Sequence, residues 1–140
     1  MLNPNLGQID LLKPDIYSDF VNSFNKVPFS NDLSRVTGED AVGQSLKNLF
    51  LTGKGERFYR PSLGGNIRNL LFELDTTVDD NFEGVKFDLI QLASMYEPRA
   101  ENVQIDIRAE NNGVNFKVIY RVLNIPDRTF NIEFFVKRVR

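Results

Sequence analysis

The chain has 140 residues and a net charge of −2, so it fits one compact domain and gives no reason to expect nucleic acid as a partner. It contains neither cysteine nor histidine, which excludes disulfides, thiolate metal sites and the usual general base, and leaves catalysis to carboxylates, lysine, tyrosine or an oxygen-bound metal. No apolar run approaches the roughly 18 residues of a membrane span, and a chain without cysteine fits assembly in a reducing cytoplasm.

The first segment, residues 1–36, is predicted to be an N-terminal arm. Pro4, Pro14 and Pro28 interrupt any long periodic pattern, among many Asn, Asp and Ser residues. Such an arm would be partly ordered against the domain of residues 37–140 and partly available to a neighbour. A disordered terminus is the alternative interpretation.

A first helix is predicted after residue 37. Thr37-Gly38-Glu39-Asp40 is typical of a helix start, because the Thr side chain can accept an amide hydrogen bond and the acids offset the helix dipole. Its apolar stripe is formed by Val42, Leu46, Leu49 and Phe50. Gly53 and Gly55 would end the helix, and the sequence around them lacks the spacing of a phosphate-binding loop.

The clearest helical pattern leads up to Pro98. Thr76 and Thr77 followed by acidic residues predict its start, and Pro98 predicts its end, because the residue before a proline is pushed out of helical geometry. The apolar positions between them are spaced by three or four residues: Val78, Phe82, Val85, Leu89, Leu92 and Tyr96.

The remainder of the chain alternates apolar and polar residues and predicts three strands. Asn111-Asn112-Gly113 is a hairpin turn signal between the first two, and Pro126-Asp127 would separate the second from the third. The predicted fold class is therefore α+β, an N-terminal arm and helices packed on a three-stranded antiparallel C-terminal meander. Apolar residues on both faces of the last two strands indicate either a sheet covered twice or a large internal core.

An acidic cluster precedes and opens the long helix. Its members are Glu73, Asp75, Asp79, Asp80 and Glu83. Two suitably spaced carboxylates are all that a glycoside hydrolase needs, so Glu73 with Asp79 or Asp80 leaves a peptidoglycan-cleaving enzyme open. Helix capping explains the same residues without catalysis, and the spacing of a calcium-binding loop is absent. No metal or cofactor is expected.

The turn Tyr96-Glu97-Pro98-Arg99 supports two interpretations. One is a helix stop with solvated neighbours. The other is a binding site, because Glu97 and Arg99 flank a rigid proline and are held in a fixed relative geometry, suited to bidentate hydrogen bonds with a partner surface.

The order of these pieces resembles a known family. A capped helix leads into GERFYRPSLGGNIRNLLFE, then a long helix ends in Tyr-Glu-Pro-Arg, and a three-strand meander closes the chain. This resembles the baseplate wedge proteins of T-even-type phages, the gene product twenty-five family, called lysozyme-like in older naming. It is similar also to the small baseplate subunit of type VI secretion systems.

The resemblance implies a non-enzymatic structural subunit of a contractile tail, within a sixfold hetero-oligomeric baseplate of the virion that is assembled in the host cytoplasm. Glu97, Pro98 and Arg99 would anchor the subunit on the core bundle of the larger wedge proteins. The exposed edge of the last strand, about residues 129–139, would template the first ring of tail sheath subunits. The residues implicated there are Phe130, Ile132, Phe134, Val136, Lys137 and Arg138.

Overall fold

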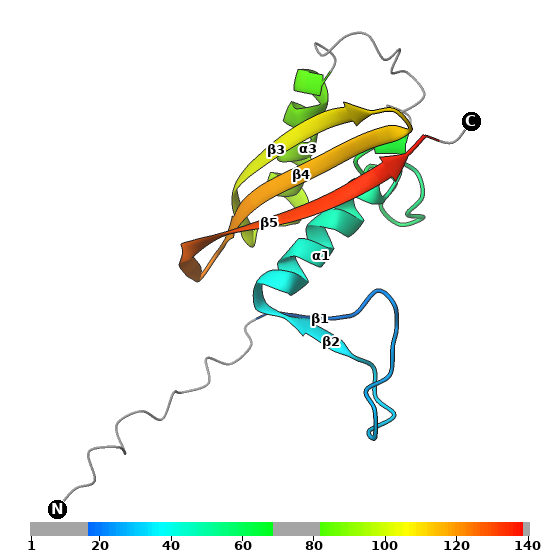
Figure 1. Cartoon of the computed structure of the whole chain (residues 1–140), viewed down its shortest axis with the longest axis vertical. Helices are drawn as coiled ribbons and strands as arrows, with labels where there is room; N and C mark the ends of the chain where they lie inside the picture. Colours follow the sequence, from blue (N-terminus) through cyan, green and yellow to red (C-terminus); the bar gives the residue numbers. More distant parts are fainter. Residues whose placement is uncertain (1–16, 69–81, 139–140) are drawn as a thin grey trace, which may run out of the picture. The chain divides into compact units, whose positions relative to one another are not determined.

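The computed structural model describes residues 17–68 and 82–138, and within them it leaves the side chain of Pro126 undescribed. The chain divides into two compact units, Met1–Ala41 and Val42–Arg140. Among the described residues, an antiparallel sheet of three strands and two helices make an α+β fold, as predicted (Figure 1).

The first unit contains a small hairpin that the sequence did not predict. β1 (Ser18–Phe20) pairs antiparallel with β2 (Arg35–Thr37), and the Arg35 guanidinium lies 5.6 Å from the centre of the Phe20 ring. Strands of three residues carry too little alternation to be recognised in a sequence. The predicted division of the chain into an arm of residues 1–36 and a domain of residues 37–140 stays a prediction.

The predicted first helix is confirmed as α1 (Gly38–Leu51). All four residues of its predicted apolar stripe are buried. Gly43 allows the helix to approach the sheet closely: a Cβ atom there would lie 2.5 Å from the Tyr120 hydroxyl oxygen and 3.0 Å from a methyl carbon of Ile132. In the second unit, α1 therefore packs on the two strands that carry these residues.

The second described helix is α3 (Phe82–Tyr96), which buries Phe82, Leu89 and Ala93. Its end confirms the effect of Pro98. The predicted start at Thr76 and Thr77 lies outside the described residues.

The three strands follow in antiparallel order, β3 (Ala100–Glu110), β4 (Gly113–Val122) and β5 (Ile125–Lys137), joined first by the predicted Asn111-Asn112 turn. The prediction that Pro126 separates the strands is wrong, because β5 begins one residue before it. Arg121 pairs with Thr129 and Val122 with Ile125, so residues 126–128 bulge out of the ladder. A bulge in an edge strand tolerates proline, which has no N–H to donate.

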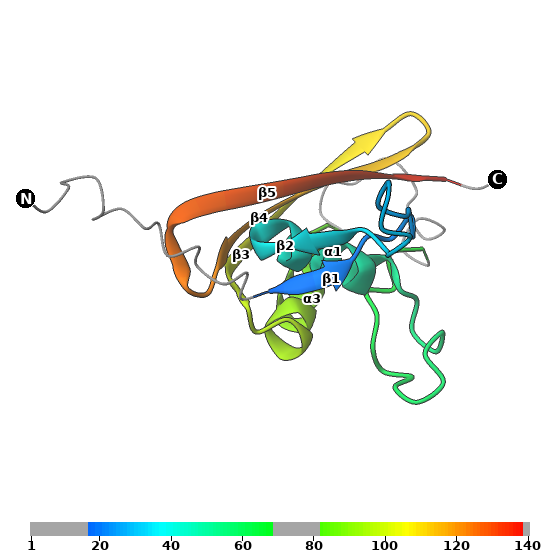
Figure 2. The ribbon, with the colours of Figure 1, turned by 90° about the horizontal axis from the view of Figure 1, so that it is seen from below.

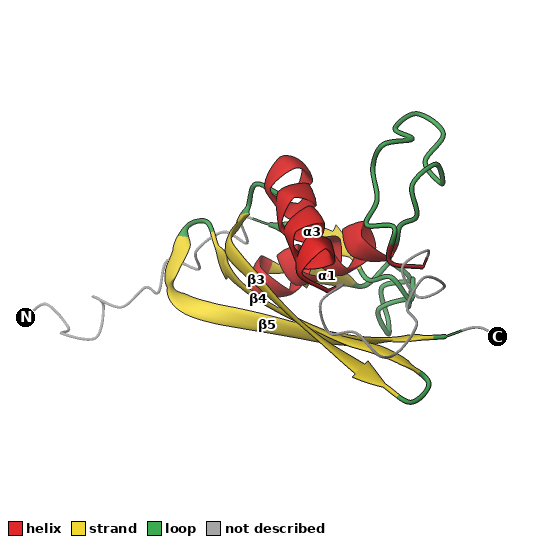
Figure 3. Ribbon diagram, turned by 90° about the horizontal axis from the view of Figure 1, so that it is seen from above, coloured by secondary structure: helices red, strands yellow, loops and turns green. Residues whose placement is uncertain are grey.

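The two faces of this sheet differ in character. The helices cover one face, and Figures 2 and 3 show both helices on that same side. The inner residues are apolar and include the stacked pair Phe116 and Phe134, with ring centres 5.2 Å apart. The outer face carries charged residues such as Lys117, which pairs with Glu133 at 3.4 Å. The apolar core thus lies on the inner face. Phe135 is half-exposed on the outer face, and a second cover over that face stays a prediction.

Candidate functional site

The turn that follows α3 is fixed by backbone hydrogen bonds. The Glu97 amide donates to the Ala93 carbonyl at 2.8 Å, and the Ala100 amide donates back to the Glu97 carbonyl at 3.0 Å. The Arg99 carbonyl accepts from the Leu123 amide, which ties the turn to the connection between β4 and β5. These hydrogen bonds therefore fix the backbone from which the side chains of Glu97, Pro98 and Arg99 project.

Glu97 is the one buried charged side chain among the residues that the structure describes, with 2% of its surface exposed. Arg99 donates from Nε to one carboxylate oxygen at 2.5 Å and from Nη2 to the other at 2.6 Å. The Ser45 hydroxyl of α1 donates a short hydrogen bond to the second oxygen. Three donors from two elements thus satisfy the buried carboxylate, as burial of a charge requires.

Burial by itself raises the pKa of Glu97, because it disfavours the charged form. The hydrogen bonds from Arg99 and Ser45, and the nearby positive charge of Arg99, lower the pKa by more in sum. The net pKa of Glu97 therefore lies below its ordinary value, and the carboxylate is ionised at neutral pH. Glu97 and Arg99 therefore form an ion pair with each other, whereas the sequence had predicted only a fixed relative geometry, with both residues available to a partner.

The two charged residues do not have equal access to solvent. Glu97 points inward to α1, whereas the Arg99 side chain is 32% exposed and Pro98 is exposed. Sequence reasoning missed Ser45, which lies 52 residues from Glu97 and carries no signal of its own. In this geometry Glu97 orients the guanidinium, and Pro98 and Arg99 form the accessible surface of the turn.

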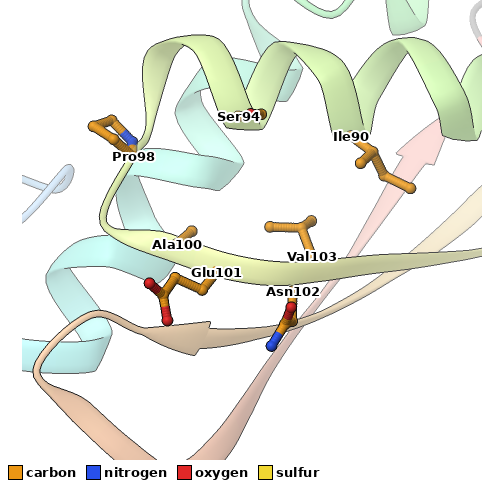
Figure 4. Close-up of a pocket in the computed structure, with 7 residues that line it drawn as sticks. All are labelled: Ile90, Ser94, Pro98, Ala100, Glu101, Asn102 and Val103. Atoms are coloured by element: carbon orange, nitrogen blue, oxygen red, sulfur yellow. The ribbon is translucent and has the colours of Figure 1, made fainter.

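A groove begins at Pro98 and runs between α3 and the start of β3, with a volume of about 680 Å³. Figure 4 shows Ile90 of α3 and Val103 of β3 pointing into the space between the two elements. A bulge between Glu101 and Gln104, with Asn102 at a positive φ of 51°, interrupts the pairing of β3 with β4 along this groove. Two more apolar side chains of α3, Phe87 and Met95, are exposed.

The six strand residues implicated by the sequence divide between two environments. β5 is an edge strand of the described sheet, paired with β4 on one side. Its four apolar candidates point to the inner face, with Phe134 buried and Phe130, Ile132 and Val136 partly buried. Lys137 and Arg138 are exposed at its end, where the Arg138 amide donates to the Asn112 carbonyl. What such an edge offers to another chain is its backbone, together with these two cations.

Of the acidic cluster, only Glu83 falls within the described residues, and it is exposed and paired with Lys86 at 2.8 Å. Glu73, Asp75, Asp79 and Asp80 lie outside them. Residues 17–68 and 82–138 contain no group of three acidic, His or Cys side chains that could hold a metal ion. No helix in this part of the chain is long and apolar enough to cross a membrane.

Solved structures of similar fold come from contractile injection machines. The chain resembles a component of the cryo-EM structure of the anti-feeding prophage baseplate, with a TM-score of 0.58, 21% identity and coverage of 89% of this chain and 87% of the other. It resembles a component of the baseplate complex of the type VI secretion system, with a TM-score of 0.52, 17% identity and coverage of 69% and 91%. The fold is thus one that baseplate components of such machines adopt.

Residues 36–127 match the family model of the baseplate wedge protein gp25, and the chain belongs to this family. The baseplate wedge protein gp25 of Enterobacteria phage T4 is 29% identical over 97 residues, which are 66% of this chain and 67% of the T4 protein. A crystal structure of a putative tail lysozyme from Geobacter sulfurreducens has the same fold, with a TM-score of 0.59, 21% identity and coverage of 75% and 95%. The predicted resemblance is confirmed.

Proposed function

We propose that the chain is a non-enzymatic structural subunit of the baseplate wedge of a contractile tail. The observation that carries the proposal is the buried Glu97–Arg99 pair, which orients an accessible arginine at the end of α3. The turn anchors the subunit on the helical core bundle of the larger wedge proteins, within a sixfold assembly at the virion baseplate that forms in the host cytoplasm.

Pro98 and Arg99 provide the anchor, and Glu97 acts through Arg99 rather than by direct contact. A guanidinium with two of its donors committed to Glu97 has its plane fixed, so little side-chain entropy is lost when a partner binds it. The adjoining groove supports this location, because Ile90 and Val103 offer apolar surface beside a charged anchor. Apolar cores with an arginine anchor are typical of protein interfaces.

The edge of β5 templates the first ring of sheath subunits. A strand of the sheath subunit would add to the backbone of β5 and extend the sheet, since strand addition needs main-chain donors and acceptors along an edge. Lys137 and Arg138 would favour an acidic segment at the end of that added strand. Reversing both charges is expected to weaken sheath attachment without displacing the chain from the wedge.

The wedge proposal is tested by co-expressing the full chain with the larger wedge proteins of the same system. The chain should co-purify with them in a stoichiometric complex, and the sheath subunit should join that complex. Failure of the folded chain to enter any complex with the wedge proteins would contradict the proposal.

The rival function is a peptidoglycan-cleaving enzyme that uses Glu73 with Asp79 or Asp80, and the tail-lysozyme name of one structural neighbour favours it. It predicts that the purified chain clears cell-wall suspensions and that Glu73→Gln abolishes the clearing. The structural role predicts no clearing at any pH.

A further inference from the structure

The loop of residues 53–65 displays two aromatic side chains that the proposed function does not use. Phe58 and Tyr59 are 95% and 97% exposed, and their rings meet edge to face with centres 6.2 Å apart. Each aromatic side chain can bury about 150–250 Å² in an interface. The pair therefore presents an apolar patch comparable in area to the largest apolar patch on a typical monomeric protein. We call residues 53–65 the aromatic loop.

The conformation of the aromatic loop is fixed by its own backbone. The Gly55 amide donates to the Pro61 carbonyl at 2.8 Å, and the Gly65 amide donates to the Thr52 carbonyl at 2.9 Å. Gly64, at a φ of +143°, passes so close to the chain just after α1 that a Cβ atom would lie 2.4 Å from the Thr52 carbonyl oxygen. The two backbone hydrogen bonds, and a close approach that only glycine permits at position 64, hold the loop in one conformation. They indicate a binding surface that is formed before a partner binds.

The loop is also tied to the end of α3. The hydroxyl groups of Ser62 and Tyr96 lie 3.3 Å apart and share a hydrogen bond. The aromatic loop and the Glu97 turn are therefore linked within the second unit.

Cations outnumber carboxylates around the two rings. Lys54, Arg57 and Arg60 are exposed, and within the described part of the chain neither arginine forms an ion pair. The loop also contains one carboxylate, Glu56, which lies 3.6 Å from Arg68, and the positive charge of Arg68 neutralises it. The rings are thus bordered by cations whose charge is not balanced locally, in a chain whose net charge is −2.

From this juxtaposition we infer that the aromatic loop is a second docking site, and that its partner is another wedge protein with an apolar pocket rimmed by carboxylates. The inference rests on the proposed function for the class of partner. Phe58 and Tyr59 fill the pocket, and Arg57 and Arg60 pair with the carboxylates, since aromatic residues and arginine are the side chains that dominate interface energetics. Nucleic acid fits less well, because three cations on one loop form no continuous basic track.

Binding of the purified full chain to the immobilised complex of the larger wedge proteins, lacking this chain, tests the inference. Phe58→Ser/Tyr59→Ser and Arg57→Glu/Arg60→Glu are each expected to weaken binding by about tenfold or more, and the charge reversal should also reduce its salt dependence. The matched controls are Phe135→Ser, which removes a half-exposed ring on the outer face of the sheet, and Arg108→Glu/Arg128→Glu, which changes the net charge equally. The controls should bind like the unmodified chain.

Equal affinity of the loop variants and the unmodified chain, or equal losses in the controls, would overturn the inference. If the unmodified chain fails to bind, the wedge proposal itself is contradicted, so the two failures are distinguishable. A photo-crosslinking residue at position 58 should join the loop to an Asp- or Glu-rich segment of a wedge protein. Cross-links to a second copy or to a basic segment would contradict the stated partner, as would tight binding of an oligothymidine of about 20 nucleotides.

Discussion

The Ser45 hydroxyl donates a hydrogen bond to the Glu97 carboxylate, so a polar residue in the middle of α1 holds the turn that ends α3. Arg99, two residues after Glu97, donates the other hydrogen bonds to the same carboxylate. The turn is therefore part of the folded interior of the second unit at Glu97 and part of its surface at Pro98 and Arg99.

Ser45→Ala should destabilise the fold by about 1 kcal/mol, because it removes one donor from a buried carboxylate while Arg99 remains. The same change should bring the pKa of Glu97 closer to its ordinary value. Urea unfolding measures the first effect, and an NMR titration of the Glu97 side chain measures the second. Ser94→Ala, at an exposed position of α3, is the control and should leave both unchanged.

Arg99→Ala should cost about 2–3 kcal/mol of unfolding free energy, because it leaves a buried carboxylate without its charged partner. Arg108→Ala breaks a pair of the same spacing, with Arg108 and Asp106 3.1 Å apart, but both side chains are exposed. That change should cost less than about 0.5 kcal/mol. Equal losses in the two variants, measured by denaturant unfolding, would show that burial of Glu97 does not matter.

The stability contributed by Glu97 should depend on pH. Its pKa in the folded chain lies below the ordinary value of the unfolded chain, so the folded state favours the charged form. This contribution is complete above the ordinary glutamate pKa of about 4.3 and is lost as the pH falls through the lower, folded value. Unfolding free energies of the unmodified chain and of Glu97→Gln should therefore differ most near neutral pH and converge in acid. A difference in unfolding free energy that grows in acid would contradict the lowered pKa of Glu97.

Two glycines in helices should respond oppositely to alanine. Gly43→Ala should destabilise by about 1–3 kcal/mol, because its Cβ would collide with Tyr120 and Ile132. Gly84→Ala should stabilise by up to about 1 kcal/mol, since nothing lies within 4 Å of a Cβ there and alanine is the better helix former. Thermal unfolding of both variants checks the pair. A loss at Gly84 or a gain at Gly43 would contradict the packing described for α1 and α3.

Local signals in the sequence predicted the elements that depend on neighbouring residues. The stripe from Val42 to Phe50 predicted α1, Pro98 predicted the end of α3, and Asn111-Asn112-Gly113 predicted the first hairpin of the sheet. These features arise from side-chain periodicity and from the backbone preferences of proline, asparagine and glycine, which act over a few residues.

Features that depend on distant residues could not be predicted in this way. Nothing near Ser45 indicates its bond to Glu97, and nothing in Pro126 indicates that a bulge will admit it to an edge strand. The fixed geometry of Glu97 and Arg99 about Pro98 was predicted, but their pairing with each other and the burial of Glu97 depend on how α1 packs against the turn. The roles of the turn and of the β5 edge in binding partners stay proposals.

The anchoring role of the Glu97 turn is tested by the affinity of the full chain for the complex of larger wedge proteins, compared between two matched double variants. Glu97→Ala/Arg99→Ala removes the buried pair together with its accessible arginine, and Asp106→Ala/Arg108→Ala removes an exposed pair of the same spacing on the outer face of the sheet. Both variants should remain folded by circular dichroism, but the first should lose wedge binding and the second should keep it. Wedge binding with unchanged affinity by a folded Glu97→Ala/Arg99→Ala chain would contradict the anchoring role of the turn.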